Sequence, residues 1–384
     1  MSHSKRTIVY FAGSRWDEVP GTDRRLTMAL GQNTQVLWVD PPFSALSRHA
    51  KESSAPRSSV TSVAPGVLRV RVRTVPGSSR FGMRAVASRD IESSLRRVIR
   101  ALNAEIVAVV VATPRAAFPR SLPGTRILYV TDDWIAGAAL MKLSERAITR
   151  TLLSNMAMAD VRFAVSPDLA SSLSARDRES RNVEVLPNGC TQVDLPEAQS
   201  YDGEKTVALV GQLNERLDMD SLDAVARTGV RIVVMGPRTE KDEVAGRRLD
   251  AFLAQPNVEW LGSIPYAELP AKLSTVSVGL TPYIDNSFNR SSFPLKTLEY
   301  LASGLAVVST DLPAVRWLGT RFIDVASNPT DFAQRVIERV SEPQSRRERQ
   351  RRAAFASNHT WESRAHQLSA AIGAPTAVVA ADVV

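Results

Sequence analysis

Residues 289–310 read NRSSFPLKTLEYLASGLAVVST, and they are the most informative part of the chain. They predict a polar loop, a short helix, a glycine stop and a buried strand. Pro294 suits a first helical turn because its missing N–H has no partner there, and Gly304 suits the left-handed position that ends a helix. The apolar run that begins at Ala306 is typical of a strand in a parallel sheet. The stretch therefore indicates an α/β domain.

The predicted helix divides its side chains between two faces. The apolar positions that should pack on a sheet are Leu295, Leu298 and Ala302. Lys296, Glu299 and Ser303 lie on another face and can point together. A loop that leads into a helix N-terminus attracts anions, because the first backbone N–H groups there have no partner. This arrangement suits a sugar nucleotide, with Lys296 on the diphosphate and Glu299 accepting hydrogen bonds from a ribose diol. An ordinary amphipathic helix is the alternative.

Residues 289–310 resemble the donor-binding motif of retaining glycosyltransferases of GT-B architecture, particularly family 4, the glycosyl transferases group 1 of the bacterial envelope-polysaccharide type. Glu299 matches the second glutamate of that motif, whereas Ser291 stands at the position of the first. The contact to the transferred sugar would then fall to Ser291, Ser292 or Asn289. The donor-binding residues that the resemblance implies are Gly211, Arg216, Asn289, Ser291, Ser292, Lys296, Thr297 and Glu299.

The order of predicted strands and helices favours two domains. One strand–helix alternation begins at residues 7–11 and a second at residues 206–210, while the Ser- and Pro-rich stretch 49–66 predicts a loop. The resemblance implies the GT-B class, an α/β fold of two doubly wound Rossmann-like domains that face each other across a cleft, with a C-terminal helix crossing back to the first domain. The expected division is an acceptor-side domain at 1–190, its returning helix at 361–384, and a donor-binding domain at 195–360.

The loop after residues 206–210 supplies further candidates in the second domain. Gly211 would let the backbone approach phosphates, and two cations would neutralise them. Gln212 replaces the first cation of the family pattern, and Arg216 stands near the second. Arg216 and Lys296 are thus the predicted diphosphate clamp, and both are candidate catalytic residues because they would stabilise the leaving group.

Two loops of the first domain carry candidate side chains. Gly13, Trp16 and Asp17 follow the first strand and would line the acceptor side. The Gly-x-Gly-x-x-Gly pattern is missing there, which weighs against an oxidoreductase. Asp132 and Asp133 follow a later strand and are candidate catalytic residues. They would bind sugar hydroxyls, act as a base or stabilise developing positive charge, or else one of them caps the following helix.

The net charge of +8 calls for an anionic partner. Arginines gather in residues 84–100 and 346–352. Anionic lipid headgroups or lipid-linked diphosphates would attract both segments, and a solvated basic surface is the alternative. No nucleic-acid-binding module or aromatic stacking pattern appears, so we expect no nucleic-acid partner.

Cysteine usage and hydropathy bear on localisation. The single cysteine, Cys190, excludes an intrachain disulfide and suits a reducing compartment. No apolar run approaches the ~20 residues that span a bilayer, and the N-terminal residues show no signal segment. We expect a cytoplasmic protein, peripheral at the inner face of the plasma membrane. The four histidines show no metal-binding spacing, so we expect neither a metal nor another cofactor.

The resemblance implies a glycosyltransferase of hexosyltransferase type. It would move a sugar from a nucleotide-diphosphate sugar to a hydroxyl of a glycan or lipid-linked acceptor, with retention, in cell-envelope or exopolysaccharide synthesis. Two alternatives remain open. One is a GT-B sugar-nucleotide epimerase, and the other is a catalytically silent scaffold subunit that binds a sugar nucleotide. Ser291 and Gln212, which replace the motif's first glutamate and first cation, favour the silent subunit.

Overall fold

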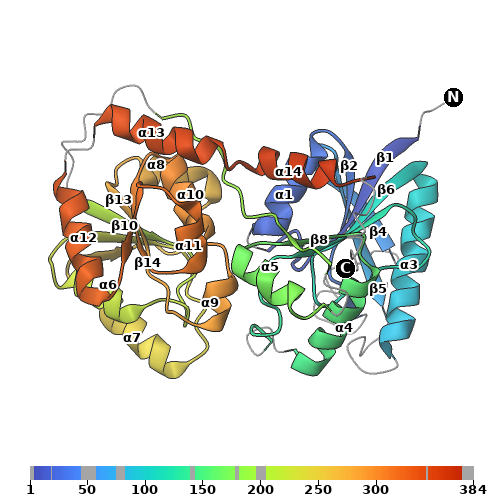
Figure 1. Ribbon diagram of the computed structural model, residues 1–384, viewed down its shortest axis with the longest axis horizontal. Coiled ribbons are helices and arrows are strands. Elements are labelled where there is room, and N and C mark those ends of the chain that lie inside the picture. The colour runs from blue at the N-terminus through green and yellow to red at the C-terminus, as the bar shows by residue number, and fades with distance from the viewer. Residues whose placement is uncertain are drawn as a thin grey trace, which may run out of the picture. The chain divides into compact units, whose positions relative to one another are not determined.

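The chain divides into two compact units. The first comprises Met1–Pro187 and Trp361–Val384, and the second comprises Asn188–Thr360. Helices cover both faces of the sheet in each unit (Figure 1). The computed structural model describes residues 4–18, 20–44, 58–74, 83–138, 143–177, 181–195, 205–342 and 345–373.

The first unit is built on a nine-stranded sheet. Its order is β3-β5-β2-β1-β6-β7-β8-β9, and β4 pairs with β5. Only the β4–β5 pairing is antiparallel among the described strands. The strands are β1 (Lys5–Phe11), β2 (Gln35–Val39), β3 (Phe43–Ser44), β4 (Ser58–Ala64), β5 (Val67–Thr74), β6 (Ala104–Val111), β7 (Thr125–Val130), β8 (Val161–Ala164) and β9 (Glu184–Val185). The helices are α1 (Thr22–Gly31), α3 (Met83–Ala101), α4 (Glu145–Met158), α5 (Pro167–Ser174) and α14 (Trp361–Ala370).

The central strands of this sheet are apolar and buried over most of their carboxyl-terminal halves, because both faces are covered there. Tyr10, Trp38, Tyr129 and Phe163 are fully buried on β1, β2, β7 and β8. The prediction of a loop over residues 49–66 is wrong for β4. Its serine-rich sequence lies at the sheet edge and pairs with β5 through a turn at Pro65 and Gly66. Residues 45–57 lie outside the described part of the chain.

The second unit contains a six-stranded parallel sheet of order β12-β11-β10-β13-β14-β15. The strand order reverses beside β10, and ligands of doubly wound sheets bind at the carboxyl ends of the strands at such a point. The strands are β10 (Thr206–Val210), β11 (Arg231–Met235), β12 (Val258–Trp260), β13 (Val278–Thr281), β14 (Ala306–Thr310) and β15 (Ile323–Ala326). The helices are α6 (Met219–Ala226), α7 (Glu243–Leu253), η1 (Tyr266–Glu268), α8 (Leu269–Leu273), α9 (Ser287–Ser291), α10 (Leu295–Ala302), α11 (Pro313–Leu318), α12 (Pro329–Ser341) and α13 (Arg346–Ser357).

The residues 289–310 largely adopt the predicted structure. Helix α10, the left-handed Gly304 with φ of 77° and strand β14 are confirmed. The predicted polar loop is wrong in part, because residues 289–291 close the short helix α9, which Asn286 caps by accepting from the Asn289 N–H. Pro294 is the N-cap of α10 rather than a residue of its first turn.

Tyr300 fixes α10 on the sheet. Its hydroxyl accepts from the Val210 N–H at 2.7 Å and donates to the Ala208 carbonyl at 3.2 Å. A Cβ on Gly279 would lie 2.2 Å from the Tyr300 ring, so only glycine lets the ring rest on β13. The helix that carries Lys296 and Glu299 is thereby held against β10 and β13, beside the reversal of strand order.

Candidate functional site

The loop after β10 and the first turn of α10 lie side by side. Gly211 ends β10 with φ of 141°, a conformation that side chains rarely adopt. A Cβ built on Gly211 would lie 4.0 Å from the Lys296 Cε. The predicted phosphate-approach glycine and the predicted phosphate-binding lysine are therefore neighbours at the carboxyl ends of the strands.

Lys296 and Glu299 form an ion pair on α10. The Lys296 Nζ lies 2.6 Å from the Glu299 Oε2, and the two side chains are 19% and 5% exposed. The lysine thus compensates the charge of an almost fully buried carboxylate. Ser303 does not share this role, because its hydroxyl donates to the main-chain carbonyl of Glu299 at 3.0 Å.

Arg216 is a half-buried cation held by neutral groups. Its Nε donates to the Asn289 Oδ1 at 2.8 Å, and its guanidinium lies 5.4 Å from the Tyr283 ring centre and 4.9 Å from that of Phe288. Within the described ranges, no carboxylate forms an ion pair with Arg216. Its direction is thus fixed by a hydrogen bond and two aromatic rings while its charge stays available to an anion.

The other predicted donor-binding side chains on α9 and α10 are buried. Asn289 uses its amide fully, since Nδ2 donates to the Arg216 carbonyl at 3.3 Å and to the Ile284 carbonyl at 2.9 Å. Ser292 donates to the Phe288 carbonyl at 2.9 Å. The exposed fractions of Asn289, Ser291, Ser292 and Thr297 are 1%, 4%, 6% and 0%. Asn289 therefore positions Arg216, and both of its Nδ2 hydrogens are already used.

The loop after β1 places its three candidates differently. The Gly13 N–H donates to the Asp23 Oδ2 at 2.8 Å, and the Gly13 backbone is exposed. The exposed Asp17 carboxylate forms a bidentate ion pair with Arg69. Trp16, by contrast, lies in the core, since it is 6% exposed and packs edge-on against Trp38. The expectation that Trp16 lines the acceptor side is therefore corrected to a packing role.

Asp23 is a site candidate that the sequence analysis missed. It lies in the first turn of α1, is 8% exposed, and accepts from the Tyr10 hydroxyl at 2.9 Å as well as from Gly13. Burial raises its pKa to about 6, and the nearby charge of Asp132 acts in the same direction. An acidic residue in the first turn of a helix that follows a glycine-containing loop was the available signal.

The two carboxylates after β7 have different surroundings. The Asp133 Oδ1 accepts from the Ile135 and Ala136 N–H groups at 3.1 and 3.0 Å. Asp133 thus caps the following turn, as the alternative to substrate contact predicted. Asp132 is half-buried, and its charge adds to the burial that raises the pKa of Tyr129. Asp132 therefore lies near Asp23 and Tyr129, at the carboxyl edge of the sheet, and is the stronger candidate for substrate contact.

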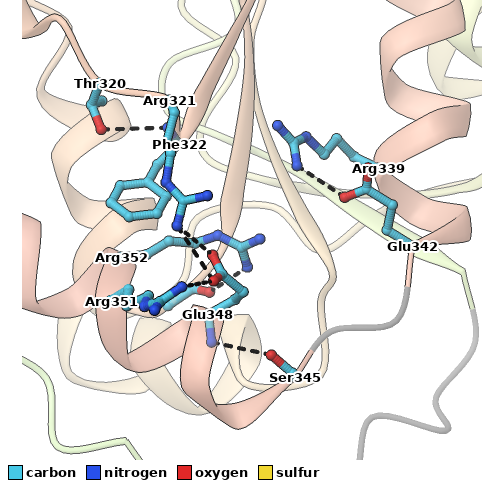
Figure 2. A network of polar contacts seen from close by, with 10 residues as sticks. Thr320, Arg321, Phe322, Arg339, Glu342, Ser345, Glu348, Arg351 and Arg352 are labelled. Atoms are coloured by element: carbon cyan, nitrogen blue, oxygen red, sulfur yellow. Dashed lines mark hydrogen bonds and ion pairs between the residues drawn. The ribbon is translucent and has the colours of Figure 1, made fainter.

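The basic run 346–352 is only partly a surface feature. Arg349 and Arg352 are 7% and 4% exposed and donate to the carbonyls of Ser303 and Gly304, each at 3.2 Å. They place positive charge at the C-terminal end of α10, where the helix dipole is negative. Burial lowers the pKa of Arg352 to about 10. Arg352 lies beside the exposed cluster in which Glu348 pairs with both Arg321 and Arg351 (Figure 2).

The arginines of α3 are exposed instead. Helix α3 packs on β5 and β6, and its outward side chains include Arg89, Arg96, Arg97 and Arg100. The side chain of Arg84 lies outside the described residues. Of the two predicted basic segments, α3 thus keeps more of its charge at the surface. In the described ranges, no helix combines the length and the apolar character that crossing a membrane requires.

One acidic Asp-x-Asp sequence of the kind that can bind a metal occurs at Asp218 and Asp220, and the expectation of no metal overlooked it. Asp218 caps α6 by accepting from the N–H groups of Asp220 and Ser221. Asp220 pairs with Arg248 at 2.6 Å. Both carboxylates therefore have structural partners, and no cluster of three or more His, Cys, Asp or Glu side chains suited to a metal occurs among the described residues.

Comparison with known proteins finds a family similarity in the second unit. Residues 204–342 match the family model described as Glycosyl transferases group 1. A Bacillus subtilis (strain 168) protein, whose name assigns it to teichuronic acid biosynthesis as glycosyltransferase TuaH, is 29% identical over 123 residues. That match spans 31% of this chain and 30% of the relative, so the chain aligns with less than a third of that protein's length. The family resemblance predicted from the sequence is confirmed for this region.

Solved structures extend the likeness of fold to nearly the whole chain. Sucrose-phosphate synthase of Thermosynechococcus elongatus superposes with a TM-score of 0.72 at 14% identity, covering 95% of this chain and 98% of that one. An alpha,alpha-trehalose-phosphate synthase (UDP-forming) of Burkholderia xenovorans, in complex with glucose-6-phosphate, gives a TM-score of 0.67 at 12% identity and coverages of 96% and 100%. This chain has two sheets whose strands are parallel except for the β4–β5 pairing. Together with these neighbours, the sheets confirm the predicted GT-B fold class.

Proposed function

We propose that this chain, whose residues 204–342 form a glycosyl transferases group 1 domain, is a glycosyltransferase that uses a nucleotide-diphosphate sugar. It transfers the sugar to a hydroxyl of a glycan or lipid-linked acceptor, with retention, in the synthesis of an envelope polysaccharide. The observation that carries the proposal is the grouping of Gly211, Lys296 and Glu299 at the carboxyl ends of parallel strands, with the preoriented Arg216 on the same loop as Gly211.

The proposed donor site holds the diphosphate by charge. The Gly211 backbone, the Lys296 ammonium and the Arg216 guanidinium would surround the phosphates, and both cations would stabilise the charge that develops on the leaving group. When phosphate draws Lys296 away, the Glu299 carboxylate becomes free to accept hydrogen bonds from the ribose hydroxyls. Two protein cations supply the neutralisation for which many enzymes use a metal, so the proposal includes no metal and no other cofactor.

The proposed reaction needs no protein base. The acceptor hydroxyl attacks the anomeric carbon on the face from which the diphosphate departs, and the bond from that carbon to the phosphate oxygen breaks. The acceptor proton moves to the departing phosphate oxygen, which balances the charge and retains the configuration. Asp132 of the first unit is the candidate for stabilising positive charge on the transferred sugar.

The proposed cellular setting is the inner face of the plasma membrane. The exposed arginines of α3 would attract anionic headgroups over a range set by the salt concentration. The name of the Bacillus relative, which refers to teichuronic acid, supports an envelope polymer as the product class. The protein would thus work in the cytoplasm beside its acceptor.

A catalytically silent scaffold subunit is the second candidate. Gln212, in the place of a cation, is exposed and accepts from the Thr239 hydroxyl at 3.3 Å. Ser291, in the place of the first glutamate, is 4% exposed. These two positions leave the site with fewer charged groups than the family pattern. An epimerase is the remaining alternative, and it would convert the donor without any acceptor.

Incubation with a panel of UDP- and GDP-sugars, with and without a short-chain lipid-linked glycan, separates the three activities. The proposal predicts acceptor-dependent release of nucleoside diphosphate and a glycosylated product, with Lys296→Ala much slower and Lys272→Ala, an exposed lysine on α8, unchanged. Conversion of the donor to an epimer without acceptor would establish the epimerase. Binding of nucleotide with no turnover of any donor would establish the scaffold.

A further inference from the structure

Strand β5 carries a row of arginines on one face of the first sheet. Arg69, Arg71 and Arg73 alternate with apolar residues, so their side chains leave the same face of the strand. Val67 belongs to that face as well, and a Cβ on Gly31 of α1 would lie 2.7 Å from its Cγ2. The arginine row therefore continues from beneath α1 towards the carboxyl end of β5.

Burial decreases along this row. Val67 and Arg69 are 1% and 7% exposed, whereas Arg71 and Arg73 are half-buried. Arg69 binds two carboxylates, with its Nε on the Asp40 Oδ2 at 2.8 Å and its two terminal nitrogens on Asp17. The first arginine is thus a structural ion pair, and the other two reach the carboxyl edge of the sheet.

The loop after β1 lies within the field of these cations. The hydrogen bonds from Arg69 lower the pKa of Asp17, and the charges of Arg71 and Arg24 lower it further. Arg24 stands on α1 with its guanidinium 4.6 Å from the Trp16 ring centre, and it donates to the Trp16 carbonyl at 3.0 Å. Several guanidinium groups therefore surround the exposed Asp17.

Arg71 and Arg73 have no carboxylate partner within the described residues. The residue opposite Arg71 on β4 is Ser59, and the residue opposite Arg73 on β3 is Phe43. The nearby Asp40 carboxylate is already occupied, since it also accepts from the Trp38 Nε1 and the Trp16 N–H. Among the described residues, these two half-buried guanidinium groups therefore form no ion pair at this edge.

We propose that Arg71 and Arg73 bind a phosphate or diphosphate group of the acceptor substrate. Guanidinium groups bind phosphate oxygens in a bidentate manner, and partial burial strengthens that interaction relative to a solvated one. The inference rests on the proposed function, in which the first unit receives the acceptor. It adds that the acceptor is an anionic phosphate ester, recognised beside the loop that carries Gly13 and Asp17.

Calorimetric titration with inorganic pyrophosphate at fixed ionic strength tests this site. The full-length Arg216→Ala/Lys296→Ala variant serves as the background, because it lacks the proposed donor clamp and isolates the first unit. Adding Arg71→Gln and Arg73→Gln should weaken pyrophosphate binding at least tenfold, while adding Arg96→Gln and Arg100→Gln on α3 should not. Because Arg71 and Arg73 are half-buried and lack carboxylate partners among the described residues, the melting temperature should stay unchanged.

Equal pyrophosphate affinity with and without the β5 substitutions would overturn the proposal. So would stronger binding of glucuronate than of phosphate esters, since that would indicate a carboxylate site. Glucose 6-phosphate and geranyl diphosphate are titrated in the same way. Weaker binding of either ligand after substitution of Arg71 and Arg73 supports the site, and the ligand that is affected shows whether the acceptor is a sugar phosphate or a lipid-linked diphosphate. Nucleoside diphosphate binding to otherwise wild-type Arg71→Gln/Arg73→Gln should persist, so failure of this site is distinguishable from failure of the donor site.

Discussion

The Nζ of Lys296 lies 2.6 Å from the Oε2 of Glu299, one turn further along α10, and this contact joins the two residues on which the proposed donor site depends. Because the Glu299 side chain is 5% exposed, Lys296 stabilises the fold by pairing with it, in addition to its proposed role in binding phosphate. Loss of nucleotide binding on mutation must therefore be separated from loss of stability.

Lys296→Ala should lower the free energy of unfolding by about 1–3 kcal/mol, because it leaves a buried carboxylate without its partner. Adding Glu299→Gln removes the uncompensated charge and should restore most of that stability without restoring nucleotide affinity. Thermal melts and calorimetry of both variants make this measurement, with the exposed Lys272→Ala as control. Equal melting temperatures of wild type and Lys296→Ala would show that the pair contributes nothing to folding.

Asp132 and Asp133 should respond differently to replacement by asparagine. Asp132→Asn removes the charge proposed to stabilise the transferred sugar, so the rate constant for transfer should fall at least about tenfold, or ~1.4 kcal/mol. Asp133→Asn keeps the cap of the following turn and should stay near wild type, whereas Asp133→Ala should cost about 1 kcal/mol of stability. Full activity in Asp132→Asn would remove that residue from the site.

Asp23 should make stability depend on pH. Burial raises its folded-state pKa from 3.8 to about 6, so the folded protein binds this proton more tightly than the unfolded chain. The free energy of unfolding therefore includes a contribution from protonated Asp23 of up to about 3 kcal/mol. This contribution is fully present below about pH 4 and is lost as the pH rises through about 6. Asp23→Asn keeps an acceptor for the Gly13 N–H and should lack this slope.

Thermal melts of wild type and Asp23→Asn at pH 4.5 and 7.5 measure this difference. The asparagine variant should gain relative to wild type at the higher pH. A difference in melting temperature that does not change between the two pH values would mean that Asp23 keeps its ordinary pKa in the folded protein.

The run 346–352 should separate into structural and surface arginines. Arg352→Ala removes the hydrogen bond to the Gly304 carbonyl at the end of α10 and should cost about 1–3 kcal/mol of stability. Arg347→Ala, on the exposed side of the same helix, should change stability by less than about 0.5 kcal/mol but weaken sedimentation with anionic vesicles. The reverse pattern in melts and vesicle binding would contradict the burial assigned to these two side chains.

Local patterns in the sequence were sufficient for the helix and strand of residues 295–310. The spacing of Leu298 and Ala302 and the stop at Gly304 depend on neighbours within one helix, and the structure places all three as the periodicity requires. By contrast, the roles of Arg349 and Arg352 depend on contacts between α13 and the end of α10. Their hydrogen-bond partners, Ser303 and Gly304, lie 46 and 48 positions earlier in the chain. From sequence alone, a run of arginines predicts an exposed surface, because the burial of individual side chains depends on the helix that packs against them.

The candidate site shows the same limit. Residue type and motif position indicated Lys296, Arg216 and Glu299, but no local pattern indicated that Asn289 positions Arg216 through two hydrogen bonds. Asp23 was missed because its burial comes from Tyr10 and Gly13 on the preceding strand and loop. Trp16 was assigned to the acceptor side from its position after the first strand, yet it is 6% exposed and its ring packs edge-on against Trp38.

Calorimetric titration with uridine and guanosine diphosphate, in the presence of a metal chelator, tests whether Lys296 and Arg216 form a metal-free diphosphate site. The wild-type protein should bind at least one of these nucleotides without metal. Arg216→Ala and Lys296→Ala should each weaken binding by about 1.5–3 kcal/mol, roughly ten- to a hundredfold, because each removes a charge-assisted partner of the phosphates. Lys272→Ala should leave the affinity unchanged. Nucleoside diphosphate affinity that survives the combined loss of Arg216 and Lys296 would contradict the assignment of this site.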